Sequence, residues 1–204
     1  MTVSELMVLN MALDGKDIFG FPSFESTGKS ELLIQSVKKA LIEKGMLENE
    51  TSFTMEGVRY VKWMKDYKEA KKYVSLGIVI LGVSEDKKTI MLESAGDPAE
   101  YEFRPADISE CFQQISNLYH FLKINSKKTG KAISQDIRYE DLMDKYALDH
   151  RNALFISTYD QKGAVVSDEI FFLNDKGLCY YDCIVGTLTE KYKEAEKIIR
   201  ERMA

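Results

Sequence analysis

The run from Val74 to Val83 (VSLGIVILGV) constrains the fold most, because it is almost wholly apolar and rich in β-branched residues. Such a run is typical of a strand that is covered on both faces. Lys88–Ser94 and Tyr101–Phe103 predict two shorter strands. A helix is expected after Arg104-Pro105, with apolar residues at Ile108, Phe112, Ile115, Leu118 and Leu122. Residues 73–124 are therefore interpreted as a β-β-β-α half.

Residues 132–204 repeat this order behind a short helix expected at Tyr139–Tyr146. The turns Asp160–Gly163 (DQKG) and Asn174–Gly177 (NDKG) both end in a glycine that tolerates positive φ. This repetition predicts an antiparallel meander, with strands at 153–159, 164–173 and 178–185. A terminal helix is expected to start at Thr187 or Thr189, with Leu188, Tyr192, Ala195 and Ile199 on its buried face.

The first 72 residues are expected to form a helical segment. Thr2 and Glu5 have the spacing of a capping box, and Ser26 or Thr27 is expected to cap a second helix that ends before Gly45. Thr54 is expected to cap a third helix, with its apolar positions at Met55, Val58, Val61, Met64 and Tyr67. Residues 46–53 fit either a short strand or a loop. The aromatic loop at 18–24, with Phe19 and Phe24, is interpreted as pinned into the core, and an exposed partner patch is the alternative.

These segments lead to one fold prediction. We expect a single α+β domain over residues 1–204, made of the helical segment 1–72 and the two halves 73–124 and 132–204. Its sheet is expected to be mostly antiparallel, with the two β-β-β-α halves related by a pseudo-twofold axis and flanked by helices. A chain of 204 residues is long enough to bury a sizeable core without disulfides or metals.

Composition narrows the classes of function. The net charge of −5 argues against a dedicated binder of nucleic acid or anionic membranes. The longest apolar run is about ten residues, whereas a membrane-spanning helix needs about 20. The N-terminus lacks the pattern of a signal peptide, and three cysteines, an odd number, fit a reducing compartment. We therefore expect a cytoplasmic protein that does not insert into a membrane.

Neither the cysteines nor a glycine-rich segment predicts a cofactor or a metal. Cys179 and Cys183 would lie roughly 13 Å apart along a strand, too far for a disulfide or a shared metal. Cys111 is expected on the buried side of a helix, so all three are interpreted as core thiols. Gly28-Lys29-Ser30 resembles the end of a phosphate-binding loop, but Ser23 occupies the position of the first glycine. Helix capping explains the same residues.

No constellation of residues predicts catalysis. The two histidines are His120 and His150, and the adjacent pair Asp149-His150 has no G-x-S-x-G motif with it. The carboxylates show no two-carboxylate setting. We expect no enzyme and no catalytic, metal or cofactor residues. An enzyme of unrecognised class is a weaker alternative, which a deep polar pocket would revive.

A DNA-binding regulator is the second alternative. The helix ending in EKGML, the polar stretch after it, and FTMEGVRYVKWM resemble the back half of a winged-helix domain. In this interpretation Lys29, Lys38, Lys39 and Lys44 form the basic face of a recognition helix. A C-terminal sensing domain would follow the winged-helix domain. Glu31 and Glu43 offset this charge, and the helix lacks the Arg, Asn and Gln cluster that reads base edges. Nucleic acid is therefore not the expected partner.

The order of elements resembles the EspG family of cytosolic chaperones in type VII secretion. Four stretches carry the resemblance: ELMVLNMALDGKDIFGFPSF, SVKKALIEKGMLENETSFTMEGVRYVKWM, YVSLGIVILGVSEDKKTIMLE and GAVVSDEIFFLNDKGLCYYD. The chain is shorter than that family's members and richer in Lys and Tyr. The resemblance implies an α+β fold without catalysis or metal. It also implies binding of a small helical secreted protein of the WXG100 or LXG type.

No motif marks a partner contact of that family in this chain. The turn Gly96-Asp97-Pro98 is proposed as the contact site, since Gly and Pro predict an exposed loop between two strands. The sequence leaves the binding face and the oligomeric state open, so a homo-oligomer stays an alternative.

Overall fold

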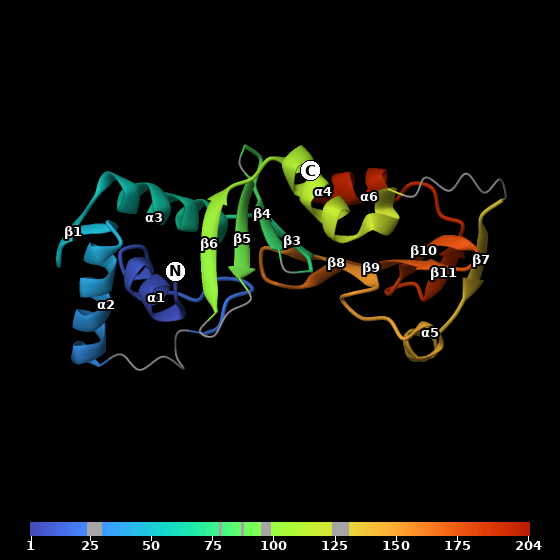
Figure 1. Cartoon of the computed structure of the whole chain (residues 1–204), viewed down its shortest axis with the longest axis horizontal. Helices are drawn as coiled ribbons and strands as arrows, with labels where there is room; N and C mark the ends of the chain where they lie inside the picture. Colours follow the sequence, from blue (N-terminus) through green and yellow to red (C-terminus); the bar gives the residue numbers. More distant parts are fainter. Residues whose placement is uncertain (24–29, 78, 87, 95–98, 124–130) are drawn as a thin grey trace. The chain divides into compact units, whose positions relative to one another are not determined.

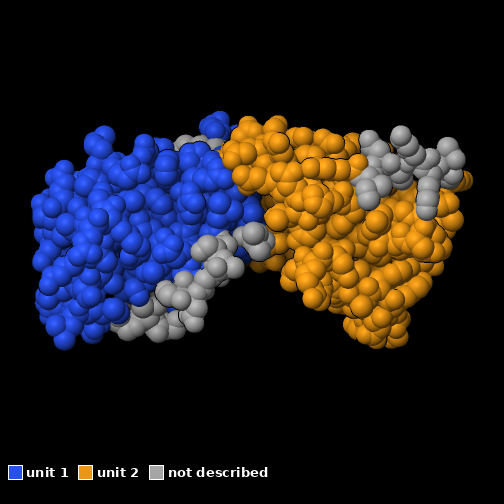
Figure 2. Space-filling view, viewed as in Figure 1, with its two compact units in different colours: residues 1–70, 78–105 blue, residues 71–77, 106–204 orange. Residues whose placement is uncertain are grey.

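The computed structural model describes residues 1–23, 30–77, 79–86, 88–94, 99–123 and 131–204. Contacts group the chain into two compact units (Figure 2). Unit 1 comprises residues 1–70 and 78–105, and unit 2 comprises residues 71–77 and 106–204. None of the helices in the described part of the chain is long and apolar enough to cross a membrane.

The described part of unit 1 combines three helices with two groups of strands (Figure 1). Its elements are α1 (Val3–Asn10), α2 (Glu31–Glu43), β1 (Leu47–Asn49), β2 (Ser52–Phe53), α3 (Met55–Lys68), β4 (Val79–Val83), β5 (Lys88–Ser94) and β6 (Glu100–Pro105). Strands β1 and β2 form a small hairpin, and β6, β5 and β4 pair antiparallel in that order.

Unit 2 holds a longer run of strands. Its elements are β3 (Lys72–Leu76), α4 (Ile108–Leu118), the 3₁₀ helix η2 (His120–Lys123), β7 (Ile133–Asp136), α5 (Tyr139–Tyr146), β8 (Ala153–Asp160), β9 (Val165–Asn174), β10 (Gly177–Asp182), β11 (Thr187–Glu190) and α6 (Ala195–Met203). These strands lie in the order β3-β8-β9-β10-β11-β7, and every pairing is antiparallel.

The α+β class, the mostly antiparallel strands and the N-terminal helical segment are therefore confirmed. The repeated order of strands followed by a helix is present too, but the first half has one strand more than predicted and the second half has two, β7 and β11. Strands β3 to β6 precede α4, and strands β8 to β11 precede α6.

The first extra strand arises because Val74–Val83 is not one strand. It is split into β3 and β4, and Gly77 between them has a φ of +73°. A residue with positive φ cannot continue an extended strand, and glycine adopts that conformation without steric cost. The prediction of one continuous strand was wrong because apolar composition alone does not reveal a break at glycine.

The second extra strand is β11, at the place where the terminal helix was expected to start. Thr187 and Thr189 pair with Asp182 and Tyr180 of β10, while Leu188 between them is buried. This alternation has the period of a strand. The helix α6 begins at Ala195, and the predicted burial of Ala195 and Ile199 on it is confirmed. The spacing of Leu188, Tyr192, Ala195 and Ile199 suggested a helix because it also fits a helical period.

The N-terminal caps of two helices were predicted correctly. Thr2 and Glu5 form the capping box of α1, and Thr54 caps α3. The expected cap of the second helix, Ser26 or Thr27, was wrong, because the Ser30 side chain accepts from the Leu33 N–H and caps α2. On α3 the buried residues are Gly57, Tyr60, Met64 and Tyr67, whereas Met55 and Val58 are exposed. The predicted stripe was displaced because it gave more weight to aliphatic residues than to Tyr60.

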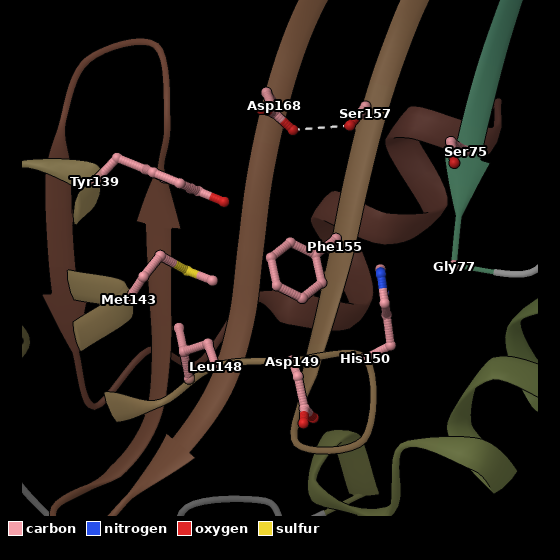
Figure 3. Close-up of a pocket in the computed structure, with 10 residues that line it drawn as sticks. All are labelled: Ser75, Gly77, Tyr139, Met143, Leu148, Asp149, His150, Phe155, Ser157 and Asp168. Atoms are coloured by element: carbon pink, nitrogen blue, oxygen red, sulfur yellow. Dashed lines mark hydrogen bonds between the residues drawn. The ribbon is translucent and has the colours of Figure 1, made fainter. Parts of the chain in front are cut away.

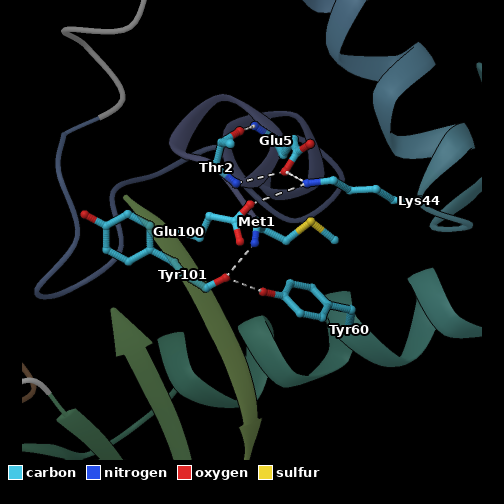
Figure 4. Close-up of polar contacts among 7 residues, drawn as sticks. All are labelled: Met1, Thr2, Glu5, Lys44, Tyr60, Glu100 and Tyr101. Carbon is cyan, nitrogen blue, oxygen red and sulfur yellow. Dashed lines mark hydrogen bonds and ion pairs between the residues drawn. The ribbon is translucent and has the colours of Figure 1, made fainter. Parts of the chain in front are cut away.

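The outer edge of β6 is protected by hydrogen bonds from other parts of unit 1 (Figure 4). The Met1 ammonium donates to the Tyr101 carbonyl at 3.0 Å, and the Tyr101 N–H donates to the Met1 carbonyl at 2.7 Å. The Tyr60 hydroxyl donates to the same Tyr101 carbonyl at 3.2 Å and accepts from the Phe103 N–H at 3.3 Å. These bonds satisfy backbone groups that an edge strand otherwise offers to another chain.

We predict that Tyr60→Phe destabilises the protein by about 1–2 kcal/mol, because the buried Phe103 N–H loses its acceptor. Urea denaturation followed by circular dichroism measures the change. Tyr139→Phe is the matched control, since no hydrogen bond of the Tyr139 hydroxyl is found among the described residues; it should change stability by less than about 0.5 kcal/mol. Equal effects of the two substitutions would contradict the edge-protecting role of Tyr60.

Helix α6 is attached to the sheet of unit 2 by a charge pair. The Glu169 carboxylate on β9 is almost wholly buried, and the Arg202 guanidinium contacts both its oxygens at 3.1 Å or less. The Tyr180 hydroxyl also donates to Glu169, at 3.4 Å. The carboxylate beside it raises the pKa of Arg202. Without Arg202 the carboxylate would be a buried charge without a cation.

We predict that Arg202→Met destabilises unit 2 by roughly 2–3 kcal/mol, somewhat less than for a fully buried pair because Arg202 is partly exposed. Adding Glu169→Gln should restore more than half of the loss, since the uncompensated charge is then removed. Thermal and urea denaturation of the two variants measure this. If the double variant is no more stable than Arg202→Met, packing rather than charge pairing fixes α6.

Candidate functional site

A pocket of about 500 Å³ opens on the face of unit 2 that carries α5 (Figure 3). Two neighbouring rows of cross-strand partners explain its position. Phe155, Ile170, Tyr181 and Leu188 form one row across β8 to β11, and α5 packs over this apolar row through Leu142 and its neighbours. Ser75, Ser157 and Asp168 form the next row, on β3, β8 and β9.

The second row makes the floor of the pocket polar. Cross-strand partners share a face of the sheet, so these three side chains point to the same side as Phe155. Helix α5 has eight residues and is about 12 Å long, which leaves the serine and aspartate row beyond its end uncovered. Tyr139 and Met143 of α5 form one wall, and the segment Leu148–His150 forms another.

Asp168 carries the charge of the floor. The Ser157 hydroxyl donates to its carboxylate at 2.7 Å. Within the described ranges Asp168 has no ion pair with a lysine or arginine, and no lysine or arginine lines the pocket. Burial, the Asp168 charge and a hydrogen bond to Asp168 raise the pKa of the nearby Cys183 thiol to about 12. Burial, followed by the charges of Cys183 and Asp168, raises the pKa of Tyr139.

Asp149 and His150 reach the same pocket but are engaged elsewhere. Asp149 accepts hydrogen bonds from the Arg151 guanidinium and the Arg151 N–H, and these hold its pKa at about 2. In Figure 3 its carboxylate points away from Phe155 and Asp168. The His150 ring contacts Phe155 edge-on, with ring centroids 5.1 Å apart. The His150 carbonyl accepts from the Tyr119 hydroxyl at 3.3 Å, which fixes this turn.

A catalytic triad requires a base between the nucleophile and the carboxylate. Here the Ser157 hydroxyl donates directly to Asp168. Among the described residues no hydrogen bond joins the His150 ring to Asp149 or Asp168. The pocket thus gathers two acids and a histidine, and its serine is bonded to an acid and not to the histidine.

Exposed apolar side chains lie beside the pocket. Tyr139 lines it, Val165 and Val166 precede Asp168 on β9, and Ile184 and Val185 follow Cys183. The Cys183 N–H donates to the Asp168 carbonyl at 2.9 Å, which places the turn after β10 next to the floor. These side chains are 42–70% exposed. We call Tyr139, Val165, Val166, Ile184 and Val185 the apolar rim.

Comparison with known proteins identifies the family of this chain. A protein-family model described as Domain of unknown function (DUF5081) matches residues 1–167. The chain belongs to the DUF5081 family. The match spans unit 1 and the part of unit 2 that includes β8. The comparison with curated proteins found no match.

The proposed contact residues Gly96, Asp97 and Pro98 of this DUF5081 protein lie outside the described residues, as do Phe24, Gly28 and Lys29. In the aromatic loop Ile18 and Phe21 are buried and Phe19 is partly buried, as the core interpretation predicted for these residues. Ser30 caps α2, as the capping interpretation predicted.

None of the three cysteines forms a disulfide; Cys111 and Cys179 are buried and Cys183 is partly buried. Burial raises the pKa of the Cys179 thiol to about 12, so neither Cys179 nor Cys183 is a thiolate at neutral pH. No group of three or more His, Cys, Asp or Glu that could hold a metal was found in the described part of the chain. Lys44 is one of the lysines assigned to the recognition helix in the DNA-binding alternative. Its Nζ lies 2.9 Å from a carboxylate oxygen of Glu5, so this charge is paired.

Sequence reasoning missed Ser157 and Asp168 as site residues. Both lie within predicted strands, so their polarity was a usable signal. A serine or an aspartate on the core-facing side of a strand indicates that the apolar core ends at that position. Their proximity depends on the register between β8 and β9, which composition does not give.

We predict that Arg151→Ala raises the pKa of Asp149 from about 2 toward its ordinary value of 3.8, because the guanidinium hydrogen bond is lost. The rise should be partial, since the backbone N–H of residue 151 still donates. A pH titration of carboxyl chemical shifts measures it. Arg138→Ala, whose guanidinium pairs with Asp141, should leave the Asp149 pKa unchanged. A pKa that stays near 2 in Arg151→Ala would contradict the role of this pair.

Proposed function

We propose that this DUF5081 protein is a non-enzymatic cytoplasmic adaptor or chaperone that binds a small helical export substrate of the WXG100 or LXG type. The apolar rim beside the pocket is the observation that carries this proposal. Clustered exposed apolar residues next to a polar recess are characteristic of protein-interaction surfaces. The resemblance of the element order to the EspG family suggests secretion chaperoning as the context.

The rim suits a helical partner. A helix docks by placing side chains spaced three, four and seven residues apart into an apolar groove. Tyr139 lines the pocket, and the pairs Val165-Val166 and Ile184-Val185 lie on β9 and on the turn after β10, so three separate elements offer contact points for such a row. An adaptor needs no reactive group, which agrees with the hydrogen bonds of Ser157, Asp168 and Asp149.

The winged-helix alternative has one observation in its favour, the order α2, β1–β2 hairpin, α3. Five cations at the C-cap of α2 and on α3 are paired: Lys44 with Glu5, Arg59 with Glu56, Lys62 with Asp66, Lys65 with Glu69 and Lys68 with Asp14. Paired cations contribute less to binding of a phosphate backbone. The adaptor proposal is therefore preferred.

We predict that the tagged protein captures a small helical protein from its native cell, and that Ile184→Asp combined with Val185→Asp reduces this capture at least tenfold. Burying an unpaired carboxylate against an apolar partner costs well over the 1.4 kcal/mol that a tenfold change in affinity requires. Mass spectrometry identifies the captured protein, and circular dichroism checks its helicity and the fold of each bait.

Met55→Asp is the matched control, because Met55 is 85% exposed but lies in unit 1. It should capture as well as the unmodified protein. Recovery of nucleic acid with salt-dependent elution would favour the winged-helix alternative, and recovery of a metabolic enzyme would also contradict the proposal. Equal capture by all three baits would show that the rim is not the docking surface.

A further inference from the structure

The pocket of unit 2 combines features that select one kind of ligand. Its floor carries the Asp168 carboxylate, with the Ser157 hydroxyl bonded to it, Ser75 on the far side of Ser157, and the Tyr139 hydroxyl on the neighbouring wall. Its walls carry the aromatic rings of Tyr139 and Phe155 and the apolar side chains of Met143 and Leu148. In Figure 3 Tyr139 and Met143 extend from α5 toward Phe155, so the aromatic and apolar groups surround the space in front of Asp168.

Charge decides which ligand fits. In the described part of the chain no cation neutralises Asp168, whereas the other acid of the lining, Asp149, is paired with Arg151. A partly buried carboxylate without a counter-ion attracts a cation more strongly than a fully solvated one. An anion would be repelled, and a purely apolar group would displace water from the floor without replacing its hydrogen bonds.

The volume and the walls of the pocket also favour an organic cation as the ligand. A volume of about 500 Å³ lies within the range of small-ligand pockets and exceeds the needs of a metal ion. Aromatic faces bind an ammonium or guanidinium group through the negative charge of the ring, and the methylene stem of such a group packs on apolar walls.

We propose that this pocket binds an alkylammonium or alkylguanidinium group, with Asp168 as the counter-charge and Tyr139 and Phe155 as aromatic walls. A lysine or arginine side chain of the docked protein would supply this group. This choice of source rests on the proposed function, whereas the binding of a cation by the pocket does not. Free amines share the same chemistry and are the other source.

The test is an NMR titration of the full-length protein with capped amino acids. Nα-acetyl-lysine N-methylamide and its arginine counterpart should shift the amide signals of Ser157, Asp168 and His150, with dissociation constants on the order of 1 mM. The norleucine counterpart has the same stem without the charge, and it should bind at least tenfold more weakly. Putrescine and agmatine, titrated in parallel, distinguish free amines from side chains by which set binds more tightly.

Three variants identify the groups responsible. Asp168→Asn should weaken binding of the lysine probe at least tenfold, and Tyr139→Leu should weaken it several-fold. Asp144→Asn is the matched control, because it removes a carboxylate of α5 outside the pocket lining and should leave binding unchanged. Circular dichroism and the dispersion of the NMR spectrum show that each variant is folded.

The proposal is overturned if the norleucine probe binds as well as the lysine probe, if Asp168→Asn binds unchanged, or if the shifted signals lie outside the pocket. These outcomes leave the adaptor proposal standing, since capture through the apolar rim is measured separately. Conversely, cation binding with no captured helical protein would retain the pocket and remove the adaptor.

Discussion

The register between β8 and β9 determines the site of unit 2. It places Phe155 opposite Ile170 and Ser157 opposite Asp168, so an apolar row and a polar row lie side by side. A shift of β9 by one residue would turn Ile170 and Asp168 to the other face of the sheet and break up both rows. The apolar row needs a cover, which α5 supplies, and the polar row does not. The boundary between the covered and the uncovered row therefore follows from the order of apolar and polar residues along β8 and β9.

The two faces of strands β9 and β10 have different roles. On the other face Glu169 and Tyr180 hold Arg202 of α6, which fixes the helix on the sheet. On the α5 face Asp168, the residue next to Glu169, has no such cation among the described residues. Adjacent acids of one strand thus serve stability on one side and remain available for a ligand on the other. This division follows from the period of two along a strand.

Local signals made much of the fold predictable. Capping residues such as Thr2, Glu5 and Thr54 act within one helical turn, and the glycine turns after Asp160 and Asn174 act within four residues, so both can be read from the sequence. The break at Gly77 ends the pairing of β3 with the distant strand β8, and the strand at Thr187–Glu190 pairs with the distant strand β7 as well as with its neighbour β10. The pocket depends on such pairing entirely, because Ser75, Ser157 and Asp168 are brought together only by three paired strands. The contact site proposed at Gly96, Asp97 and Pro98 rested on exposure alone and is not described by the structure.

The adaptor proposal unites these features without requiring chemistry. The apolar rim would provide contact area. The acidic pocket beside it would fix the position of the partner helix along the rim by binding one cation. Buried contact area contributes affinity, whereas a single charge in a recess contributes specificity. Neither role needs the His150 ring to act as a base.

Hydrogen–deuterium exchange of the protein, alone and with its captured partner, tests the central claim most directly. The account predicts slower exchange on binding in residues 139–150, 157–168 and 183–186, which form the pocket and the apolar rim. It predicts unchanged exchange in α2 and α3. Protection confined to α2, α3 and the β1–β2 hairpin, with no change around Asp168, would contradict it.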